Sequence, residues 1–256
     1  MLQINNKIQR GFGRAARSYD RYSGLHRQIA EELLARIKEG PLPSSVLDVG
    51  CGTGYLTGKV SEFFAESQIT GIDFSSDMLE MAACQHDDIT WVLGDGNDLP
   101  FPDDSFDILI SNLAYQWAGD LTGAFAEARR VLTPKGTLAI TLFGYHTCHE
   151  LFQSLIEAKA GTLQFNRLPN GPQVRDALVL GGFKMPVVDS EQIIVDFKDM
   201  HELITWLKLI GANHLARDGF IGKQTLTKAA AIYRERFACP NGVQATFEVI
   251  KAYAQK

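Results

Sequence analysis

The chain has 256 residues, 45% of them hydrophobic and 21% charged, which is enough to bury a substantial core as one large α/β domain or two small ones. The formal net charge of −5 does not favour nucleic acid as a partner, although residues 1–40 carry eight Lys and Arg against four Asp and Glu. No apolar stretch reaches the roughly 18 to 20 residues that span a bilayer, and the start of the chain lacks the apolar core of a secretory signal, so we expect a cytoplasmic protein without a membrane partner.

Apolar periodicity predicts alternating helices and strands through the first 145 residues. Residues 5–38 are expected to be helical, in one piece or two. Strands are then expected at 46–50, 68–74, 89–95, 106–112 and 137–143, with helices at 53–65, 75–85 and 121–132 between them. Ser75 or Ser76 is the expected N-cap of the helix at 75–85, and TPKG should end the helix at 121–132. This alternation predicts an α/β fold with a doubly wound, mostly parallel sheet.

The pattern changes after residue 145. Helices are expected at 149–158 and 173–183, strands at 187–197 and 245–255, and a helical stretch at 199–237. The prediction is a single domain with a seven-stranded sheet. Its parts are an N-terminal helical lid at 1–40, a core at 44–145 and a helical cap inserted at 198–238 before the last strand. The chain shows no coiled-coil seam, and we expect a monomer.

The stretch SSVLDVGCGTGYL, residues 44–56, places three glycines directly after the first strand. A dinucleotide-binding fingerprint, GxGxxG, would need another glycine where the chain has Tyr55 or Thr57. Asp48 ends the strand just before the loop, where its carboxylate would repel a pyrophosphate. The loop therefore favours a ligand without phosphate, one that carries positive charge or hydroxyl groups.

Acids also end the second and third strands, at Asp73 and Asp95. In a doubly wound sheet these ends meet at one edge, where an acid after the second strand commonly binds a ribose. Together with the GxGxG loop formed by Gly50, Gly52 and Gly54, they resemble the signature of the class I S-adenosylmethionine-dependent methyltransferases. That resemblance implies S-adenosylmethionine as cofactor, S-adenosylhomocysteine as product and no metal.

The resemblance also implies which residues contact the cofactor. Gly50, Cys51 and Gly52 would line the methionine moiety, Asp73 would bind the ribose hydroxyls, Phe74 and Met78 would flank the adenine, and Asp95 with Gly96 would meet its amino group. Asp48, at the end of the first strand, and Gly54, in the loop, are expected to contact the cofactor as well. Asn112 and Ala114 follow the fourth strand at the same edge of the sheet, so we expect cofactor contacts from them as well.

Further segments narrow the resemblance to one family. They are FGRAARSYDRYSGLHRQIAEELL at 12–34, SNLAYQWAGDL at 111–121, WLKLIGANHL at 206–215 and the loop FNRLPN at 165–170. Each is similar to a segment of the biotin-pathway malonyl-acyl-carrier-protein O-methyltransferases. The resemblance implies methyl transfer to the free carboxylate of a malonyl thioester on acyl carrier protein, giving an ester that can be extended toward a pimeloyl chain. It leaves open whether malonyl-CoA is also accepted.

A malonyl carboxylate suits a site without a general base, because carboxylates of pKa about 4 are already ionised at neutral pH. Alignment and exclusion of water should then matter most. We expect Tyr19 and Gln116 nearest the methyl group and Trp117 as an apolar wall. Further candidates for positioning the substrate are Arg14, Lys208 and His214. Five candidates have a plainer alternative: Tyr19 and Trp117 as packing residues, Asn112 as a side chain that satisfies a buried turn, Lys208 as a solvated side chain and His214 as a structural histidine.

Carrier proteins are small and acidic, so the basic N-terminal segment is a candidate docking face. Its arginines are Arg10, Arg14, Arg17, Arg21 and Arg27. A second cluster comprises Arg129, Arg130 and Lys135, although similar helix ends recur across methyltransferases. The group His146, Cys148 and His149 is too cramped for a tetrahedral metal site, and the four cysteines are too scattered for a zinc ribbon.

Three other functions stay open on the sequence. A methyltransferase acting on a quinone or phenol precursor would keep the cofactor but need a general base, which His149 or His214 would have to supply. A catalytically silent protein would bind the cofactor and transfer nothing. An oxidoreductase would need nicotinamide binding, against which the incomplete GxGxxG argues.

Overall fold

The computed structural model describes residues 2–159, 164–165, 168–212, 216–218 and 221–256. Its main sheet has the strand order β3-β2-β1-β4-β5-β10-β7. The strands are β1 Ser45–Val49, β2 Gln68–Asp73, β3 Thr90–Leu93, β4 Phe106–Asn112, β5 Leu132–Phe143, β7 Lys184–Phe197 and β10 Gly242–Gln255. β1 to β5 pair in parallel, and β10 runs antiparallel to both β5 and β7. The predicted doubly wound, seven-stranded sheet is confirmed.

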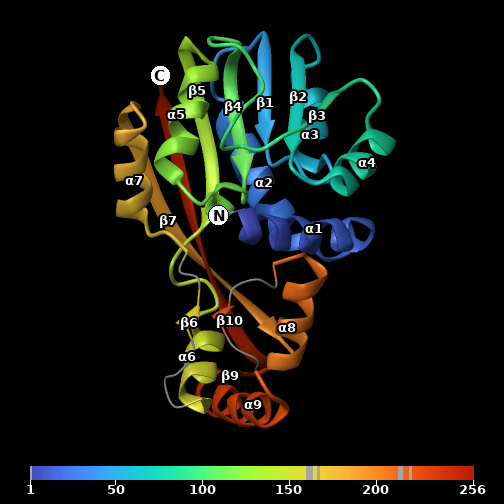
Figure 1. The fold of residues 1–256 in the computed structure, drawn as a ribbon, viewed down its shortest axis with the longest axis vertical. Coiled ribbons are helices and arrows are strands. Elements are labelled where there is room, and N and C mark those ends of the chain that lie inside the picture. Colours follow the sequence, from blue (N-terminus) through green and yellow to red (C-terminus); the bar gives the residue numbers. More distant parts are fainter. Residues whose placement is uncertain (1, 160–163, 166–167, 213–215, 219–220) are drawn as a thin grey trace.

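Alternating apolar residues fix the two faces of this sheet. Val46 packs with α2 (Gly24–Ile37) and α3 (Tyr55–Phe63), whereas its neighbour Leu47 packs with α5 (Leu121–Val131) and α7 (Gly171–Leu180). Both residues are fully buried, and the helices cover the sheet on its two sides (Figure 1). β2 pairs with one edge of β1 and β4 with the other, so the strand order reverses at β1 and a ligand crevice is expected at the carboxyl ends of these strands.

Two N-terminal helices close that edge. α1 (Leu2–Tyr22) lies across the carboxyl ends of the strands, between α4 (Ser76–Gln85) and α8 (Met200–Leu209), as Figure 1 shows. The helical pattern predicted at 5–38 is thus two helices, which meet at the buried Ser23. Ser75 caps α4 by accepting the N–H of Met78, which confirms one of the two expected caps.

The chain after residue 145 builds a second apolar cluster around the lower ends of β7 and β10 (Figure 1). α6 (His149–Ala158), α8 and α9 (Lys223–Phe237) pack there. The expectation of an all-helical stretch at 199–237 is wrong, because β8 (Ala216–Asp218) pairs with β6 (Gln164–Phe165) between α8 and α9. A short β9 (Ala238–Cys239) turns back onto β10. None of the described helices is long and apolar enough to cross a bilayer.

The TPKG segment also differs from its prediction. It lies inside β5, where the pairing with β4 jumps from Phe106–Leu132 to Ile108–Thr137. The extra residues form an irregularity in the strand rather than a loop before it. The helix α5 accordingly ends one residue earlier than expected, at Val131.

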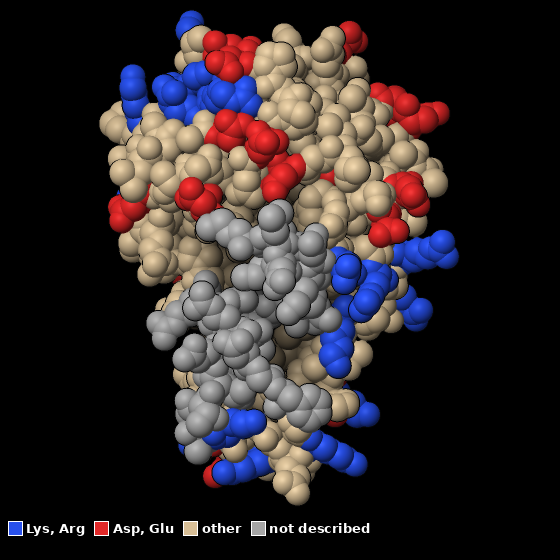
Figure 2. All heavy atoms as spheres, viewed as in Figure 1, with Lys and Arg blue, Asp and Glu red and all other residues tan. Residues whose placement is uncertain are grey.

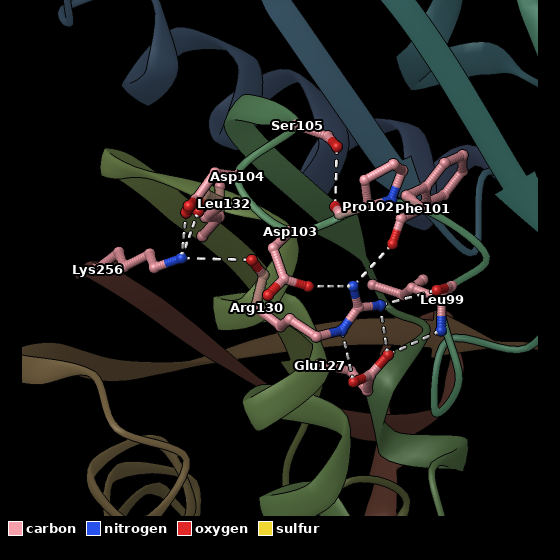
Figure 3. Close-up of polar contacts among 10 residues, drawn as sticks. All are labelled: Leu99, Phe101, Pro102, Asp103, Asp104, Ser105, Glu127, Arg130, Leu132 and Lys256. Atoms are coloured by element: carbon pink, nitrogen blue, oxygen red, sulfur yellow. Dashed lines mark hydrogen bonds and ion pairs between the residues drawn. The ribbon is translucent and has the colours of Figure 1, made fainter.

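Arg130, one of the arginines in the second basic cluster, is occupied within the fold (Figure 3). Its guanidinium pairs with Glu127 at 2.8 Å and Asp103 at 2.9 Å and donates to the carbonyl oxygens of Leu99 and Phe101. These bonds fasten the loop before β4 to α5. The charge of Arg130 is therefore paired within the protein, so this residue is poorly suited to docking a partner.

Candidate active site

Two adjoining cavities open at the carboxyl ends of β1, β2 and β4, and Gly50 lines both of them. The larger, of about 300 Å³, is walled by the ends of β1 and β2, by 94–97 and by residues of the turn after β4. Ile8 and Gln9 of α1 complete it. The smaller, of about 60 Å³, lies where α1 meets α2 and includes Asp48, Cys51 and Asn112. The predicted lid thus forms part of both cavities.

The glycine loop needs its glycines for different reasons. All three have positive φ angles, 74° at Gly50, 56° at Gly52 and 85° at Gly54. A side chain at Gly50 would collide with Cβ of Ala114, whereas Gly52 has open space around it. At Gly54 a Cβ would lie 2.8 Å from the Trp91 ring, and this glycine lines neither cavity. Gly54 therefore serves helix packing, while Gly50 and Ala114 shape the cavity wall.

Asp73 stands at the end of β2 and faces the larger cavity. Its Oδ2 accepts the N–H of Gly52 at 3.0 Å, and its Oδ1 accepts the N–H of Ser75 at 2.8 Å. Burial raises the pKa of Asp73 to about 6, despite the opposing effect of these backbone donors. The carboxyl is thus fixed between the glycine loop and α4, in the position expected for contact with a ribose.

Asp48 lines the smaller cavity and is 1% exposed. Its Oδ2 accepts a 2.6 Å hydrogen bond from Thr57 Oγ1. Burial raises the pKa of Asp48 to about 7; the Thr57 hydrogen bond opposes this shift and the charge of Asp73 adds to it. A cationic ligand beside it would favour the ionised carboxylate.

The far end of the larger cavity has the features expected for an adenine site. Asp95 and Gly96 line it, and Asp95 Oδ1 accepts from the backbone and side-chain amides of Asn97, which holds the turn closed. Phe74 lines the same cavity, whereas Met78 is buried and lines neither.

Aromatic rings cover the larger cavity on the α1 side. The Phe12 ring stands edge-on to Phe74 at 6.2 Å and to Trp117 at 5.8 Å. Gln9 Nε2 donates to the carbonyl oxygen of Phe74, so α1 is hydrogen-bonded directly to the cavity wall. Trp117 lines the same cavity, and its expected role as an apolar wall near the methyl group stays a prediction.

The other predicted substrate residues fall in different places. Tyr19 lines the smaller cavity, where burial and the nearby Asp73 and Asp20 raise the pKa of its hydroxyl. Gln116 lines neither cavity, and its Nε2 donates to the carbonyl oxygen of Leu113. Arg14 and Lys208 are exposed and lie outside both cavity walls, and His214 lies outside the described residues.

Asn112 lines the smaller cavity, but its side chain also makes hydrogen bonds that hold parts of the fold together. Nδ2 donates to the carbonyl oxygen of His26 at 3.1 Å, and Oδ1 accepts from Thr141 Oγ1 at 2.8 Å. These bonds tie the start of α2 to the ends of β4 and β5. The structure thus favours a positioning role for Asn112 over a direct one.

Several cavity residues were not predicted from the sequence. Tyr115 lines the larger cavity, and its buried hydroxyl has no hydrogen-bond partner among the described residues. His26 lines the smaller one among the rings of Tyr19, Phe143 and Trp206, and burial lowers the pKa of its imidazole to about 4. Asp20, Arg27 and His26 all belong to the segment 12–34 that carries the family resemblance, which is the one signal that pointed to them.

These walls fit S-adenosylmethionine. The larger cavity offers to a nucleoside a buried carboxyl, an apolar wall and the Tyr115 hydroxyl, which has no partner among the described residues. The smaller one offers both signs of charge to an amino-acid tail. A pyrophosphate would meet Asp48 and Asp73 instead. Among the described residues, no group of three His, Cys, Asp or Glu side chains lies close enough to hold a metal ion.

Known proteins agree with this reading of the cavity. Residues 47–140 match a family described as a methyltransferase domain. A curated malonyl-[acyl-carrier protein] O-methyltransferase of Halorhodospira halophila is 32% identical over 258 residues, which covers 96% of this chain and 86% of the relative. One from Hahella chejuensis is 34% identical over 250 residues, covering 95% of this chain and 88% of the relative. The chain belongs to the malonyl-acyl-carrier-protein O-methyltransferase family.

Solved structures support the fold of this family. A structure described as an S-adenosylmethionine-dependent methyltransferase, possibly a histamine N-methyltransferase, from Thermotoga maritima has a TM-score of 0.58 and 18% identity, covering 96% of this chain and 99% of that one. At this identity the similarity concerns the fold alone. The predicted class I methyltransferase fold and the family resemblance are both confirmed.

Proposed function

We propose that this chain transfers a methyl group from S-adenosylmethionine to the free carboxylate of a malonyl group carried on acyl carrier protein, giving a malonyl methyl ester. The supporting observation is that the similarity to curated malonyl-[acyl-carrier protein] O-methyltransferases spans 95–98% of this chain. It therefore extends beyond the glycine loop to at least part of α1, which covers the cofactor edge, and to α8, which packs against α1. The use of the ester in biotin synthesis is what the family resemblance implies.

The residues of the site act mainly by binding and by excluding water. When bound, S-adenosylmethionine supplies a methyl group on a positively charged sulfur. Asp73 and Asp95 would hold its nucleoside, Trp117 lines the cavity, and the Phe12 ring of α1 packs edge-on against Trp117. Methyl transfer to a carboxylate cancels both charges, so a covered site of low dielectric favours it.

No proton has to be removed from a carboxylate acceptor. His26 beside the smaller cavity suits this chemistry, because an imidazole of pKa about 4 is neutral at pH 7 and a weak base. The Tyr19 hydroxyl, whose pKa is raised, also stays protonated and can donate a hydrogen bond. Of the two histidines that could serve a phenol acceptor as base, His149 lies on α6 and lines neither cavity, and His214 lies outside the described residues.

The exposed face of α1 supports the acyl carrier protein as the carrier of the malonyl group. Four arginines at helical spacing are exposed on it: Arg10, Arg14, Arg17 and Arg21. Basic side chains gather on the surface where Figure 1 places α1 (Figure 2). A small acidic carrier would be steered to this face, next to the cavities that α1 covers. Arg27, which we grouped with them from the sequence, points instead into the smaller cavity.

Mass spectrometry of the carrier tests this function. Malonyl-acyl carrier protein incubated with S-adenosylmethionine and the protein should gain one methyl group, and acetyl-acyl carrier protein should gain none. If the malonyl form stays unchanged while cofactor binding is confirmed by titration, the acceptor is a different molecule. Phenol and quinone precursors would then be assayed in the same way.

A further inference from the structure

The imidazole of His26 has hydrogen-bonding capacity that the fold leaves unused. Its side chain lines the smaller cavity, and its Nδ1 is buried without a hydrogen-bond partner among the described residues. A neutral imidazole carries one N–H donor and one acceptor nitrogen. With Nδ1 buried in this way, Nε2 is the ring nitrogen that remains for a ligand, and the tautomer that can donate to that ligand carries its proton there.

Aromatic rings from three elements hold this imidazole in place. Its centroid lies 5.8 Å from that of Tyr19 on α1, 5.7 Å from that of Phe143 at the end of β5 and 6.0 Å from that of Trp206 on α8. The backbone of His26 is fixed as well, because Asn112 Nδ2 donates to its carbonyl oxygen at 3.1 Å. A donor that is already ordered can orient a ligand with little further loss of conformational entropy.

The His26 ring also lies near the place where the methyl group is expected. Gly50 lines both cavities, so a ligand with its nucleoside in the larger and its amino-acid end in the smaller has its sulfur near this residue. Tyr19 is close to the same point. Burial raises the pKa of the Tyr19 hydroxyl, and so do the charges of Asp73 and Asp20, one on the wall of each cavity. A group bound by Tyr19 and its neighbour His26 would therefore lie beside the methyl group.

Uncharged donors suit a carboxylate that has to act as a nucleophile. Burial lowers the pKa of His26 to about 4, so its imidazole is neutral at pH 7, and the Tyr19 hydroxyl stays protonated. Both can donate a hydrogen bond without placing a full positive charge on the ligand. A guanidinium would bind a carboxylate more tightly, but mainly in the ground state, because the carboxylate loses its charge during methyl transfer.

We propose that His26 binds the acceptor, donating a hydrogen bond from Nε2 to the carboxylate of the malonyl group beside the Tyr19 hydroxyl. One carboxylate oxygen accepts this bond, and the other forms the new bond to the methyl carbon. The carbon–sulfur bond breaks with its electron pair left on sulfur, and the proton of His26 stays on its nitrogen. The inference rests on the proposed function, because it names a residue that holds the acceptor of that reaction. The sequence predicted Tyr19 for this place but did not predict His26.

The carboxylate of the cofactor's amino-acid end is the other source of the same chemistry. The charged side chains of the smaller cavity, Asp20 and Arg27, suit that zwitterionic end better than a neutral imidazole does. His26 instead packs among rings of α1, β5 and α8, away from the glycine loop in sequence and in its ring contacts. These contacts favour the acceptor, and the experiment below measures the two ligands separately.

The test combines steady-state kinetics on malonyl-acyl carrier protein with calorimetric titration of S-adenosylhomocysteine. His26→Leu should raise the KM for malonyl-acyl carrier protein by about ten-fold to a hundred-fold, the range for a hydrogen bond to a charged group. Its affinity for S-adenosylhomocysteine should stay near the wild-type value, which also shows that the variant is folded. His26→Gln keeps an N–H donor in its side chain and should recover most of the lost KM.

His201→Leu is the matched control, because His201 is exposed on α8 and lines neither cavity. It should change neither constant. An unchanged KM in His26→Leu, or a glutamine variant as impaired as the leucine variant, would overturn the hydrogen bond to the acceptor while the proposed function stands. Weakened S-adenosylhomocysteine binding in His26→Leu would overturn it as well, in favour of a cofactor contact. Wild-type protein that binds S-adenosylhomocysteine but methylates no malonyl group would instead refute the proposed function, and with it the inference.

Discussion

Thr53 Oγ1 donates a 2.7 Å hydrogen bond to Asp20 Oδ1, across 33 residues of sequence. Thr53 is buried in the glycine loop, and Asp20 lies in the last turn of α1. The bond therefore joins the floor of the cofactor site to the helix that covers it. Closure of α1 and cofactor binding should be energetically coupled through this pair.

Thr53→Val should loosen α1 while keeping the shape of the loop. Losing one hydrogen bond to a charged group costs about 1.5 to 3 kcal/mol, so trypsin should cleave at the arginines of α1 at least several-fold faster in the cofactor-free protein. Limited proteolysis with the fragments identified by mass spectrometry measures this. Thr53→Ser keeps the hydroxyl and should behave as wild type; equal cleavage of the valine and serine variants would show that the bond does not hold α1.

Alanine substitutions at Gly50 and Gly52 distinguish the energetic cost of a positive φ angle from that of a steric collision. Gly52→Ala should lower the free energy of unfolding by about 1 to 2 kcal/mol, because the residue keeps a positive φ but meets no neighbour. Gly50→Ala adds a collision with Ala114 in the cavity wall, and should cost about 1 to 3 kcal/mol more and abolish cofactor binding. Urea denaturation followed by circular dichroism measures the difference. Equal losses for the two variants would contradict the packing of Gly50 against Ala114.

Cofactor binding should release protons and tighten as the pH rises from about 5 to about 8. In the cofactor-free protein the pKa values of Asp73 and Asp48 are raised to about 6 and about 7, so both carboxyls are partly protonated in this range. The positive charge of S-adenosylmethionine favours their ionised forms and lowers both pKa values on binding. Calorimetry near pH 6.5 in buffers of different ionisation enthalpy measures the released protons.

The same carboxyls should make the cofactor-free protein less stable as the pH rises, although they make cofactor binding tighter. Because their pKa values are above those of an unfolded chain, they lower the free energy of unfolding progressively as the pH rises from about 4 to about 7. Asp48→Asn should remove its share of that fall and reduce the proton release on binding. A variant with the wild-type pH profile would show that Asp48 ionises freely.

Carrier docking on α1 can be tested by charge reversal. Arg10→Glu combined with Arg17→Glu should raise the KM for malonyl-acyl carrier protein several-fold at low salt and leave kcat near the wild-type value, because rim charges act mainly on encounter. The difference should shrink as salt screens the face. Lys228→Glu on the exposed side of α9 is the control for a change of charge away from α1. Docking elsewhere would give the double variant an unchanged KM.

Residues that follow a repeating pattern could be predicted from the sequence. The strand-ending acids Asp48, Asp73 and Asp95 were located because parallel strands of a doubly wound sheet bring their carboxyl ends to one edge. The strand expected at 46–50 was likewise located by its apolar residues, and the structure has β1 there. All three acids line the two cavities in the structure.

Residues that depend on tertiary packing could not be predicted in this way. Arg27 was grouped with the docking arginines, because its spacing does not show that α2 begins inside the cofactor site. Tyr115 was not singled out within the segment at 111–121, and its place in the cavity wall and its hydroxyl, which has no partner among the described residues, are visible only in the structure. The strand β8 was missed because its partner, β6, lies about fifty residues away in the sequence.

The central claim is that the acceptor atom is a carboxylate oxygen. The measurement that tests it most directly is transfer of a labelled methyl group from S-adenosylmethionine to malonyl-acyl carrier protein, followed by mild alkaline hydrolysis and detection of labelled methanol. The account predicts one label for each malonyl group, all of it released as methanol, because alkaline hydrolysis frees the methyl group of an ester as methanol but not a methyl group on carbon or on an ether oxygen. Label that remains on the acyl chain or on the carrier protein after this treatment would contradict it.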